Sequence, residues 1–408
     1  MSERSVAGEE AVTYVQDQRE LRTLCEHLAG SDRFGLDTEF VGERTYVPRL
    51  ELIQVATAER FALIDCRAVD DLQPFFAILA ERSIEKVVHA GQQDIELFSG
   101  LSGHLPAPVF DTQIAAAMAG YGAQAGYAQL AERVLGVTVE KTETLTDWSH
   151  RPLTRAQTAY AVDDVRYLLP LYDRLRKRLT QLGRWEWVKE ELRRFETLAR
   201  SEPVDPPRAY LRVRGRGSLR PKGLTVLREI AAWREEMARE RNKPRSSIVR
   251  DEALVEIARK APTTVAALRG LRAVRSRELD RHADEVVARV RRALELPKDQ
   301  WVQPPPQDGD TPPGGVVELL QAVLQDRAEK ARIAPSLLAT HAELLRLVQV
   351  YATGGAQQLR IMQGWRRKVA GNELASILEG RASVEIDPKG PCLRVRPLDA
   401  AEEVISDE

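Results

Sequence analysis

The chain has 408 residues, of which 43% are hydrophobic and 30% charged, and its formal net charge is −1. This composition fits a globular protein, and at roughly 150 residues per domain the length predicts two or three domains. No run of about 20 apolar residues occurs, which argues against a transmembrane helix.

The cysteines and the N-terminus indicate the cellular compartment of the protein. Cys25, Cys66 and Cys392 are widely spaced and form no CxxC pair, which argues against a disulfide framework or a zinc site. The first twenty residues are acidic and polar and lack the apolar segment of a secretory signal. We therefore expect a cytoplasmic protein. Because its charges balance overall, any nucleic-acid-binding surface must concentrate cations locally.

The first 200 or so residues mix strand and helix patterns. Short apolar runs rich in β-forming residues predict strands at 33–40, 50–57, 60–65, 85–90 and 107–111. The first three are joined by short polar segments, which favours an antiparallel meander. Helical periodicity occurs at 18–30, 92–101, 111–122, 127–136 and 153–183. This order predicts an α/β domain in which a mixed sheet is flanked by helices.

The rest of the chain is predicted to be helical. Prolines and glycines at 201–223 indicate a boundary, and apolar residues then recur at helical spacing, which predicts a small all-α domain. After a Pro/Gly-rich linker, a helical stretch of similar layout follows and suggests a duplicated module. The predicted units are 1–205, 206–296 with a basic linker at its start, the linker 297–315, 316–385, and a frayed tail over 386–408.

Acidic residues in the predicted α/β domain suggest a metal site. Asp37 and Glu39 are two residues apart in a predicted strand, so both side chains point to one face of the sheet. Their apolar neighbours suggest a buried strand, where a carboxylate is costly unless it is paired or binds metal. Chance alternation on a solvated face is the alternative. Asp94 begins a predicted helix, where an acid can also serve only the helix dipole.

A tyrosine and a fourth acid share one face of the helix predicted at 153–183. Tyr160 and Asp164 are four residues apart, about one helical turn, whereas Asp163 lies off the tyrosine's face. An exposed pair on a helix surface is the alternative. Four carboxylates have one common chemical use, which is to bind two divalent cations over a phosphodiester. A tyrosine hydroxyl can orient the attacking water, although a phenol is too weak a base to take its proton.

These motifs resemble a known superfamily. DTEF, HAGQQD and YAVDDV occur in the order of the three motifs of the DEDD 3′–5′ exonucleases. One branch has a histidine five residues before the last aspartate, where this chain has Ala159, so Tyr160 places it with the tyrosine branch. The segments RLELIQVAT and 148–172 are similar to the ribonuclease D family. Residues 227–271 resemble an HRDC domain, a helical nucleic-acid-binding module, and 316–380 resemble a second, divergent copy.

The resemblance covers nearly the whole chain and carries several expectations. It implies a ribonuclease H-like catalytic domain followed by two HRDC-type domains. It implies that two Mg²⁺ or Mn²⁺ ions are bound by Asp37, Glu39, Asp94 and Asp164, with Tyr160 positioning the attacking water. It also implies an exoribonuclease that releases nucleoside 5′-monophosphates from RNA, including tRNA precursors with 3′ extensions. No membrane and no obligate protein partner are expected, and a monomer would suffice.

Other residues are candidates for RNA contact. His89, Trp148 and Arg151 lie near the motifs, with packing as the alternative for each. A basic run after the catalytic region can contact phosphates, and a solvated linker is its alternative. The run comprises Arg212, Arg214, Arg216, Arg220 and Lys222. Asp111, at the start of a predicted helix, is interpreted as a helix cap.

Two other functions use the same motifs. A 3′–5′ DNA exonuclease of repair would need the same catalytic carboxylates, which do not distinguish ribose from deoxyribose. A non-catalytic RNA-binding scaffold would keep the fold and lose a carboxylate, and here the set is complete.

Overall fold

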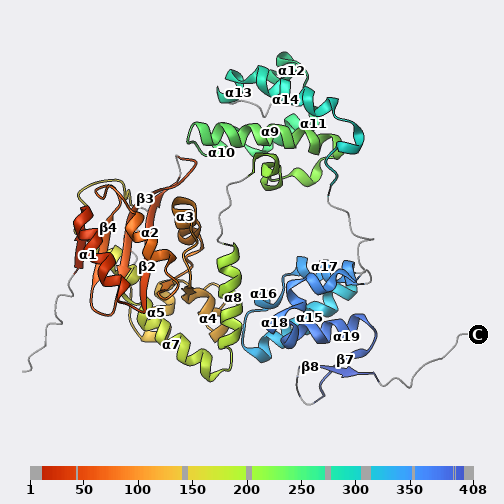
Figure 1. The fold of residues 1–408 in the computed structure, drawn as a ribbon. Coiled ribbons are helices and arrows are strands. Elements are labelled where there is room, and N and C mark those ends of the chain that lie inside the picture. The colour runs from red at the N-terminus through yellow and green to blue at the C-terminus, as the bar shows by residue number, and fades with distance from the viewer. Residues whose placement is uncertain are drawn as a thin grey trace, which may run out of the picture.

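The computed structural model describes residues 12–42, 45–139, 146–198, 205–271, 277–304, 314–351, 354–388, 390 and 392–398. An α/β region comes first, then a helical region, then a mostly helical region at the C-terminal end (Figure 1). None of the described helices is long and apolar enough to cross a membrane.

The α/β region is built on a six-stranded mixed sheet in the order β1-β4-β3-β2-β5-β6. Its strands are β1 (Val12–Val15), β2 (Arg33–Val41), β3 (Arg49–Ala56), β4 (Phe61–Asp65), β5 (Glu85–Val88) and β6 (Val109–Asp111). β3 runs antiparallel to both β2 and β4, and the other pairs are parallel. The predicted meander and mixed sheet are confirmed. Four-residue β1 was missed, because its run VTYV is too short to show a pattern.

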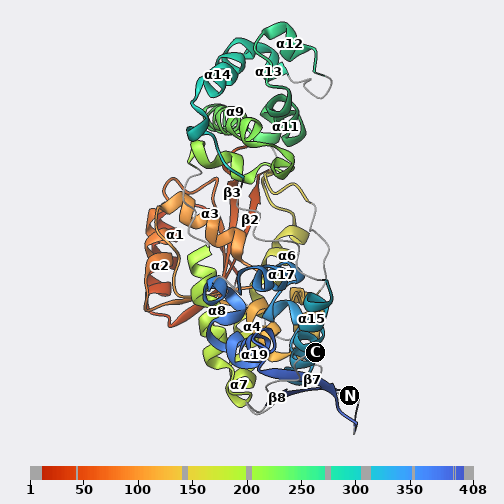
Figure 2. The same cartoon turned by 90° about the vertical axis from the view of Figure 1, so that its right-hand side faces the viewer.

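Helices cover both faces of the sheet (Figure 2). They are α1 (Gln18–Ala29), α2 (Gln73–Ala80), α3 (Gln92–Ser102), α4 (Thr112–Ala119), α5 (Tyr127–Leu135), α6 (Arg155–Arg166), α7 (Leu168–Gln181) and α8 (Trp185–Leu198). Side chains of β3 alternate between two cores: Leu52 and Ala56 pack with α4 to α7, and Ile53 and Val55 pack with α1 to α3. The helix predicted at 153–183 is two helices, because Tyr167 leaves helical geometry with φ −103° and ψ 4°.

The second region is helical, as predicted. Two 3₁₀ turns, Pro206–Arg212 and Arg216–Ser218, precede α9 (Pro221–Glu240), which lies at the centre of its own core with Trp233 fully buried. The remaining elements are α10 (Arg245–Ile248), α11 (Asp251–Lys260), α12 (Val265–Arg269), α13 (Arg277–Arg281), α14 (Ala283–Glu295) and the turn Lys298–Gln300.

The C-terminal region repeats part of that order. A long helix α15 (Gly314–Ala331), a four-residue helix α16 (Pro335–Leu338) and a third helix α17 (His341–Tyr351) follow one another as α9, α10 and α11 do. This repetition supports the predicted duplication, which stays a prediction. The turns Gly355–Gln358 and Arg360–Met362, α18 (Gly364–Arg366), the π-helical turn Arg367–Gly371 and α19 (Asn372–Leu378) complete the helical part.

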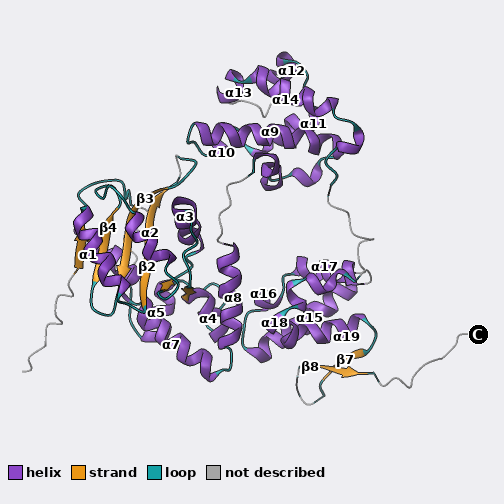
Figure 3. Ribbon diagram, in the orientation of Figure 1, coloured by secondary structure: helices purple, strands orange, loops and turns teal. Residues whose placement is uncertain are grey.

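The all-α prediction is wrong at the end of the chain. Strands β7 (Ala382–Ile386) and β8 (Leu393–Pro397) form an antiparallel hairpin (Figure 3). β8 lies inside the predicted tail, so that boundary is also wrong. Charged residues such as Glu385 and Arg394 interrupt these five-residue strands and hide their β pattern. Positions 399–408 of the tail and 305–313 of the linker lie outside the described residues.

The C-terminal region packs on α8 of the α/β region. The Trp187 and Trp365 rings stack at 4.9 Å and 15°. Arg366, only 2% exposed, donates through Nη1 and Nη2 to the two carboxylate oxygens of Glu191. The apolar cores of the two regions are continuous.

The β2–β3 hairpin joins the α/β region to the first helical region. The Tyr46 hydroxyl donates to Glu235 and accepts hydrogen bonds from Arg239 and Arg245, each at 3.0 Å. The Tyr46 N–H donates to Asn242 Oδ1 at 3.1 Å. In Figure 1 this hairpin reaches toward α10. The strand that carries Asp37 and Glu39 is therefore tied to a second domain.

Candidate active site

Three of the four predicted metal ligands meet between β2 and α6. Asp37 and Glu39 project from β2, and Asp164 comes from α6, which packs against β2, β3 and β4. One carboxylate oxygen from each residue lies within 4.8 Å of the other two. The period of the strand and the helix packing thus bring together acids that are 125 residues apart.

Asp94 lies beside this cluster and outside the 4.8 Å group. It is 9% exposed and lines a cleft with Asp37, Thr38 and His89. Its carboxylate accepts a hydrogen bond from the Thr38 hydroxyl. Since Thr38 stands between Asp37 and Glu39 on β2, this bond ties α3 to the strand that carries the other acids. Thr38 gave no signal in the sequence beyond its place in the motif.

Burial and mutual repulsion shape the electrostatics of the cluster. Burial, followed by the charges of Asp94, Asp164 and Glu39, raises the pKa of Asp37 well above its ordinary value. Burial and the charges of Asp164 and Asp94 raise the pKa of Glu39 to about 8, and burial raises the pKa of Asp94. Within the described parts of the chain, no lysine or arginine pairs with Asp37, Glu39 or Asp94. Such a set of oxygen ligands fits a hard divalent cation, which would offset the repulsion.

Tyr160 is half-buried one turn before Asp164 on α6. Its ring centroid lies 6.0 Å from that of Trp148. Trp148 is only 5% exposed and belongs to the core beneath α6. The structure therefore favours packing over RNA contact for Trp148, which supports the Tyr160 ring from the side.

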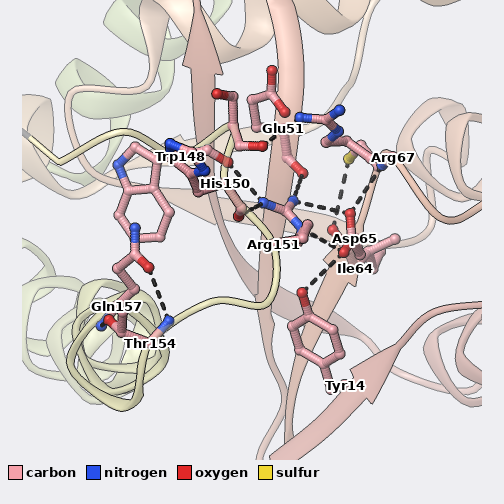
Figure 4. A network of polar contacts seen from close by, with 12 residues as sticks. Tyr14, Glu51, Ile64, Asp65, Arg67, Trp148, His150, Arg151, Thr154 and Gln157 are labelled. Carbon is pink, nitrogen blue, oxygen red and sulfur yellow. Dashed lines mark hydrogen bonds and ion pairs between the residues drawn. The ribbon is translucent and has the colours of Figure 1, made fainter.

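Arg151 fixes the segment that leads into α6 (Figure 4). Its guanidinium donates to both carboxylate oxygens of Asp65, at 2.5 and 2.9 Å, and to the Glu51 carbonyl at 2.9 Å. It also donates to the carbonyls of Trp148 and His150, at 2.7 and 2.8 Å. These bonds engage all three guanidinium nitrogens and favour a positioning role over RNA contact. Asp65 was missed, and its only sequence signal is an acid at the end of an apolar strand.

The helix α6 begins immediately after this clamp. Thr154 accepts a hydrogen bond from the Gln157 N–H at 3.1 Å, and the Gln157 side chain accepts one from the Thr154 N–H at 2.9 Å. This capping box fixes the start of the helix. Together with Arg151 it sets the positions of Tyr160 and Asp164 along the helix.

Asp111 fixes the turn that leads into α3, the helix that carries Asp94. It caps α4 by accepting from the Gln113 and Ile114 N–H groups, at 2.7 and 3.2 Å, which confirms the predicted cap. It also accepts from the N–H groups of Ala90 and Gly91, at 3.2 and 3.0 Å. A side chain at Gly91 would lie 2.7 Å from Val88, so this tight turn before α3 requires glycine.

His89 lines the cleft, and its ring is also held by a hydrogen bond to Thr112. Its Nδ1 lies 2.9 Å from the Thr112 hydroxyl, which itself donates to the Val88 carbonyl at 2.9 Å. Because that hydroxyl proton is already used, His89 Nδ1 is the donor in this pair. The tautomer is thereby fixed with Nε2 as the acceptor when the ring is neutral. A role for His89 in RNA contact stays a prediction.

The predicted basic run lies apart from the carboxylates, in the first helical region. All five side chains are exposed: Arg212, Arg214, Arg216, Arg220 and Lys222. The two 3₁₀ turns and the first turn of α9 give their backbone a defined structure. The alternative of an unstructured linker is therefore disfavoured for residues 205–222. None of the five forms an ion pair with a carboxylate of the described residues.

Comparisons with known proteins agree with this geometry. A family model described as 3′-5′ exonuclease matches residues 12–180, and the HRDC domain model matches residues 223–290. Ribonuclease D of Acidiphilium cryptum is 39% identical over 379 residues, which cover 91% of this chain and 94% of that protein. Ribonuclease D of Gluconacetobacter diazotrophicus is 38% identical over 390 residues, 95% of this chain and 98% of that protein.

A solved structure extends the likeness to three dimensions. Escherichia coli RNase D, an exoribonuclease involved in structured RNA processing, superposes with a TM-score of 0.82 at 33% identity. The match covers 91% of this chain and 99% of that chain. The likeness therefore includes the helical regions as well as the sheet.

The raised pKa of Glu39 predicts how metal-free stability depends on pH. Between its ordinary pKa of 4.5 and about 8, the folded protein binds more protons at Glu39 than the unfolded chain does. The free energy of unfolding therefore falls as pH rises through this window. We expect Glu39→Gln to raise the melting temperature of chelator-treated protein more at pH 8 than at pH 5, measured by scanning calorimetry.

The same proton linkage governs metal binding. Ligand carboxylates must lose their protons, so the increase in melting temperature caused by Mn²⁺ should be larger at pH 8 than at pH 6 in the wild type. Glu186→Gln, which removes one exposed carboxylate on α8, is the control for general charge effects. An equal Mn²⁺-induced increase in melting temperature at both pH values would contradict the raised pKa values of the buried carboxylates.

Proposed function

The chain belongs to the ribonuclease D family of 3′–5′ exoribonucleases, and from this premise we propose that Asp37, Glu39, Asp94 and Asp164 bind two divalent cations that act on the last phosphodiester of an RNA strand. The enzyme is a hydrolase, its substrate is RNA, and its fold implies divalent metal ions. The number of ions, their identity as Mg²⁺ or Mn²⁺, and the roles of single residues are our proposal. The convergence of three carboxylates beside Asp94 is the observation that carries it.

The ligand set suits two cations. Oxygen-only donors select Mg²⁺ or Mn²⁺ over softer metals, and four carboxylates can balance four positive charges. When bound, such cations supply an acidified water and charge stabilisation for the phosphodiester and the departing 3′ oxygen. Burial raises the pKa of Asp37, Glu39 and Asp94, and for Asp37 and Glu39 the neighbouring carboxylates raise it further, which bound cations would offset.

The chain's own residues supply orientation. We propose that the Tyr160 hydroxyl orients the attacking water, since it lies one turn from Asp164 on α6. Trp148 packing and the Arg151 clamp fix the ring and the helix that carries it. The Thr38–Asp94 hydrogen bond and the Asp111 bonds to the turn at 90–91 fix the opposite wall of the cleft.

We also propose that the basic run guides RNA toward the cleft. Its five exposed cations lack carboxylate partners among the described residues, so their charge is available to phosphates. They lie immediately before residues 223–290, which match the HRDC model and are called the HRDC region below. Tyr46 ties that region to the hairpin of the catalytic strand β2. Precursor tRNAs with 3′ extensions are the proposed natural substrates, on the family resemblance. Three free thiols support action in the reducing cytoplasm, and a monomer contains every proposed element.

Asp37→Asn and Asp164→Asn should each abolish metal-dependent release of nucleoside 5′-monophosphates. We expect a loss of about 10³-fold or more in kcat, because a metal ion supplies several kcal/mol of transition-state stabilisation. The assay follows a 3′-extended RNA and a matched DNA oligomer with Mg²⁺, with Mn²⁺ and with a chelator. Asp163→Asn is the matched control, since Asp163 pairs with Arg166 at 2.8 Å.

Full activity of Asp164→Asn, or loss of activity only in Asp163→Asn, would contradict the ligand assignment. Faster degradation of the DNA oligomer would favour a role in DNA repair. Chelator-resistant activity would exclude metal catalysis altogether.

Tyr160→Phe should lower kcat by roughly 10²-fold, the effect of losing one well-placed hydrogen-bonding group. Mn²⁺ affinity and melting temperature should stay unchanged, because the ring and its contact with Trp148 remain. Kinetics and calorimetric titration measure both quantities. Tyr167→Phe, at the junction of α6 and α7, is the control and should keep full activity. A collapse of Mn²⁺ affinity in Tyr160→Phe would show that the hydroxyl serves the metal site instead.

Neutralising the basic run should weaken binding of long RNA and leave chemistry intact. For the triple variant Arg212→Gln, Arg220→Gln and Lys222→Gln we expect a raised KM and an unchanged kcat on long RNA. The dependence of log K on log salt should become shallower by about 0.7 for each phosphate that the variant no longer neutralises. Arg396→Gln, which removes a cation already paired with Glu385, is the control. An unchanged salt dependence would show that RNA takes another path.

A further inference from the structure

A glutamine beneath the active site has a buried and unpartnered amide. Gln54 of β3 is 0% exposed. Among the residues that the structure describes, neither its Nε2 nor its Oε1 has a hydrogen-bond partner. Folded proteins seldom leave both ends of a buried amide unsatisfied, because each lost its bonds to water on folding. We therefore expect the Gln54 amide to gain a hydrogen-bond partner in the working protein.

The sheet register places this amide next to Asp37. Gln54 is the cross-strand partner of Asp37 in the antiparallel β2–β3 pair. Directly opposed residues project to the same face with Cβ atoms about 4.5–5.5 Å apart, which is within reach of a glutamine side chain. On the other side, Gln54 pairs with Leu63 of β4. Its only ionisable cross-strand partner is therefore a proposed metal ligand.

The same face also meets the helix of Tyr160 and Asp164. Leu52 and Ala56, which share the face of Gln54, belong to the core that includes Ala161 and Val165 of α6. Ile53 and Val55 face the opposite core. Gln54 thus lies on the floor of the site, between Asp37 at its side and α6 above.

A packing role does not explain this residue. Apart from Asp37, the neighbours on its face are the apolar residues Leu52, Ala56 and Leu63, against which a leucine would pack better than an amide. Two other buried polar groups of the same sheet have full sets of partners: the Lys86 ammonium donates to three carbonyls, and Asp65 binds Arg151. Glu51 Oε2 lacks a partner, but its other oxygen accepts from Arg49, whereas both ends of the Gln54 amide are unpartnered. The polar amide is retained where it is thermodynamically unfavourable, which is typical of functional positions.

We propose that Gln54 is a positioning residue whose amide N–H donates to the Asp37 carboxylate when that carboxylate binds metal, a hydrogen bond that the amide does not make in this structure, and that it thereby orients the carboxylate. Ligand carboxylates depend on such hydrogen bonds for their orientation. A neutral donor performs this task without adding charge to a cluster that already holds four acids, which explains glutamine in place of glutamate or lysine. The inference rests on the proposed metal site and assigns that site a further residue.

The decisive variant is Gln54→Leu, with Gln54→Met as an unbranched second choice if the leucine variant fails to fold. In metal-free protein we expect an equal or higher melting temperature, because two unsatisfied polar atoms are removed. The Mn²⁺ dissociation constant, from calorimetric titration, should rise about 10–100-fold, and kcat should fall by a similar factor. Ile53→Leu, on the same strand and facing the other core, should change neither Mn²⁺ affinity nor kcat.

Opposite signs for metal-free stability and metal affinity distinguish this role from a structural one. A lower melting temperature with unchanged Mn²⁺ affinity would overturn the proposal, because the amide would then serve the fold. Unchanged affinity and kcat in both variants would overturn it as well. If the wild type itself bound no Mn²⁺, the proposed metal site would be wrong. If the wild type bound Mn²⁺ and the Gln54 variants bound it equally well, the metal site would stand and Gln54 would have no part in it.

Discussion

Repulsion among acids in one partly enclosed cleft is the constraint on which the rest of the catalytic domain depends. Asp37, Glu39 and Asp164 present oxygens within 4.8 Å of one another, with Asp94 beside them. Burial and the neighbouring charges raise the pKa of Asp37 and Glu39. A loosely built site would relax by moving these side chains apart. The cluster therefore exists only because each acid stands on an element that is fixed by contacts elsewhere, and a cation completes the site by supplying the missing charge.

Those contacts come in three sets, one for each element. The sheet register fixes β2, and Gln54 lies opposite Asp37 within it. Arg151 and the capping box of Thr154 fix the start of α6 and therefore the positions of Tyr160 and Asp164 along the helix. Asp111 fixes the turn before α3 by binding its two N–H groups. Arg151, Thr154 and Asp111 thus serve to position other side chains, and a fixed geometry results from contacts outside the acidic cluster.

Local periodicity explains what the sequence could predict. The alternation of a strand placed Asp37 and Glu39 on one face, and the four-residue spacing of a helix selected Asp164 over Asp163. Contacts between distant segments left no such trace: Arg151 binds Asp65 across 86 positions, and Trp148 is buried by elements that no local pattern specifies. Both residues were predicted to contact RNA because a charged or aromatic residue near a motif looks the same in sequence whether it faces solvent or the core. The β7–β8 hairpin was missed because its strands are short and interrupted by charges.

The link between the catalytic strand and the HRDC region has a mechanical consequence. β2 ends in a hairpin whose Tyr46 is bound by Glu235, Arg239 and Arg245, and the same strand bears Asp37 and Glu39. A force on the HRDC region, such as the pull of RNA on the proposed RNA-binding basic run, would therefore be transmitted to the strand of the proposed metal ligands and not only to the chain that connects the two domains. Antiparallel pairing with β3 along most of its length resists that force. The long hairpin thus fits two purposes, because the pairing that makes β2 rigid enough to hold two repelling carboxylates also makes it a suitable anchor for the proposed RNA-binding region.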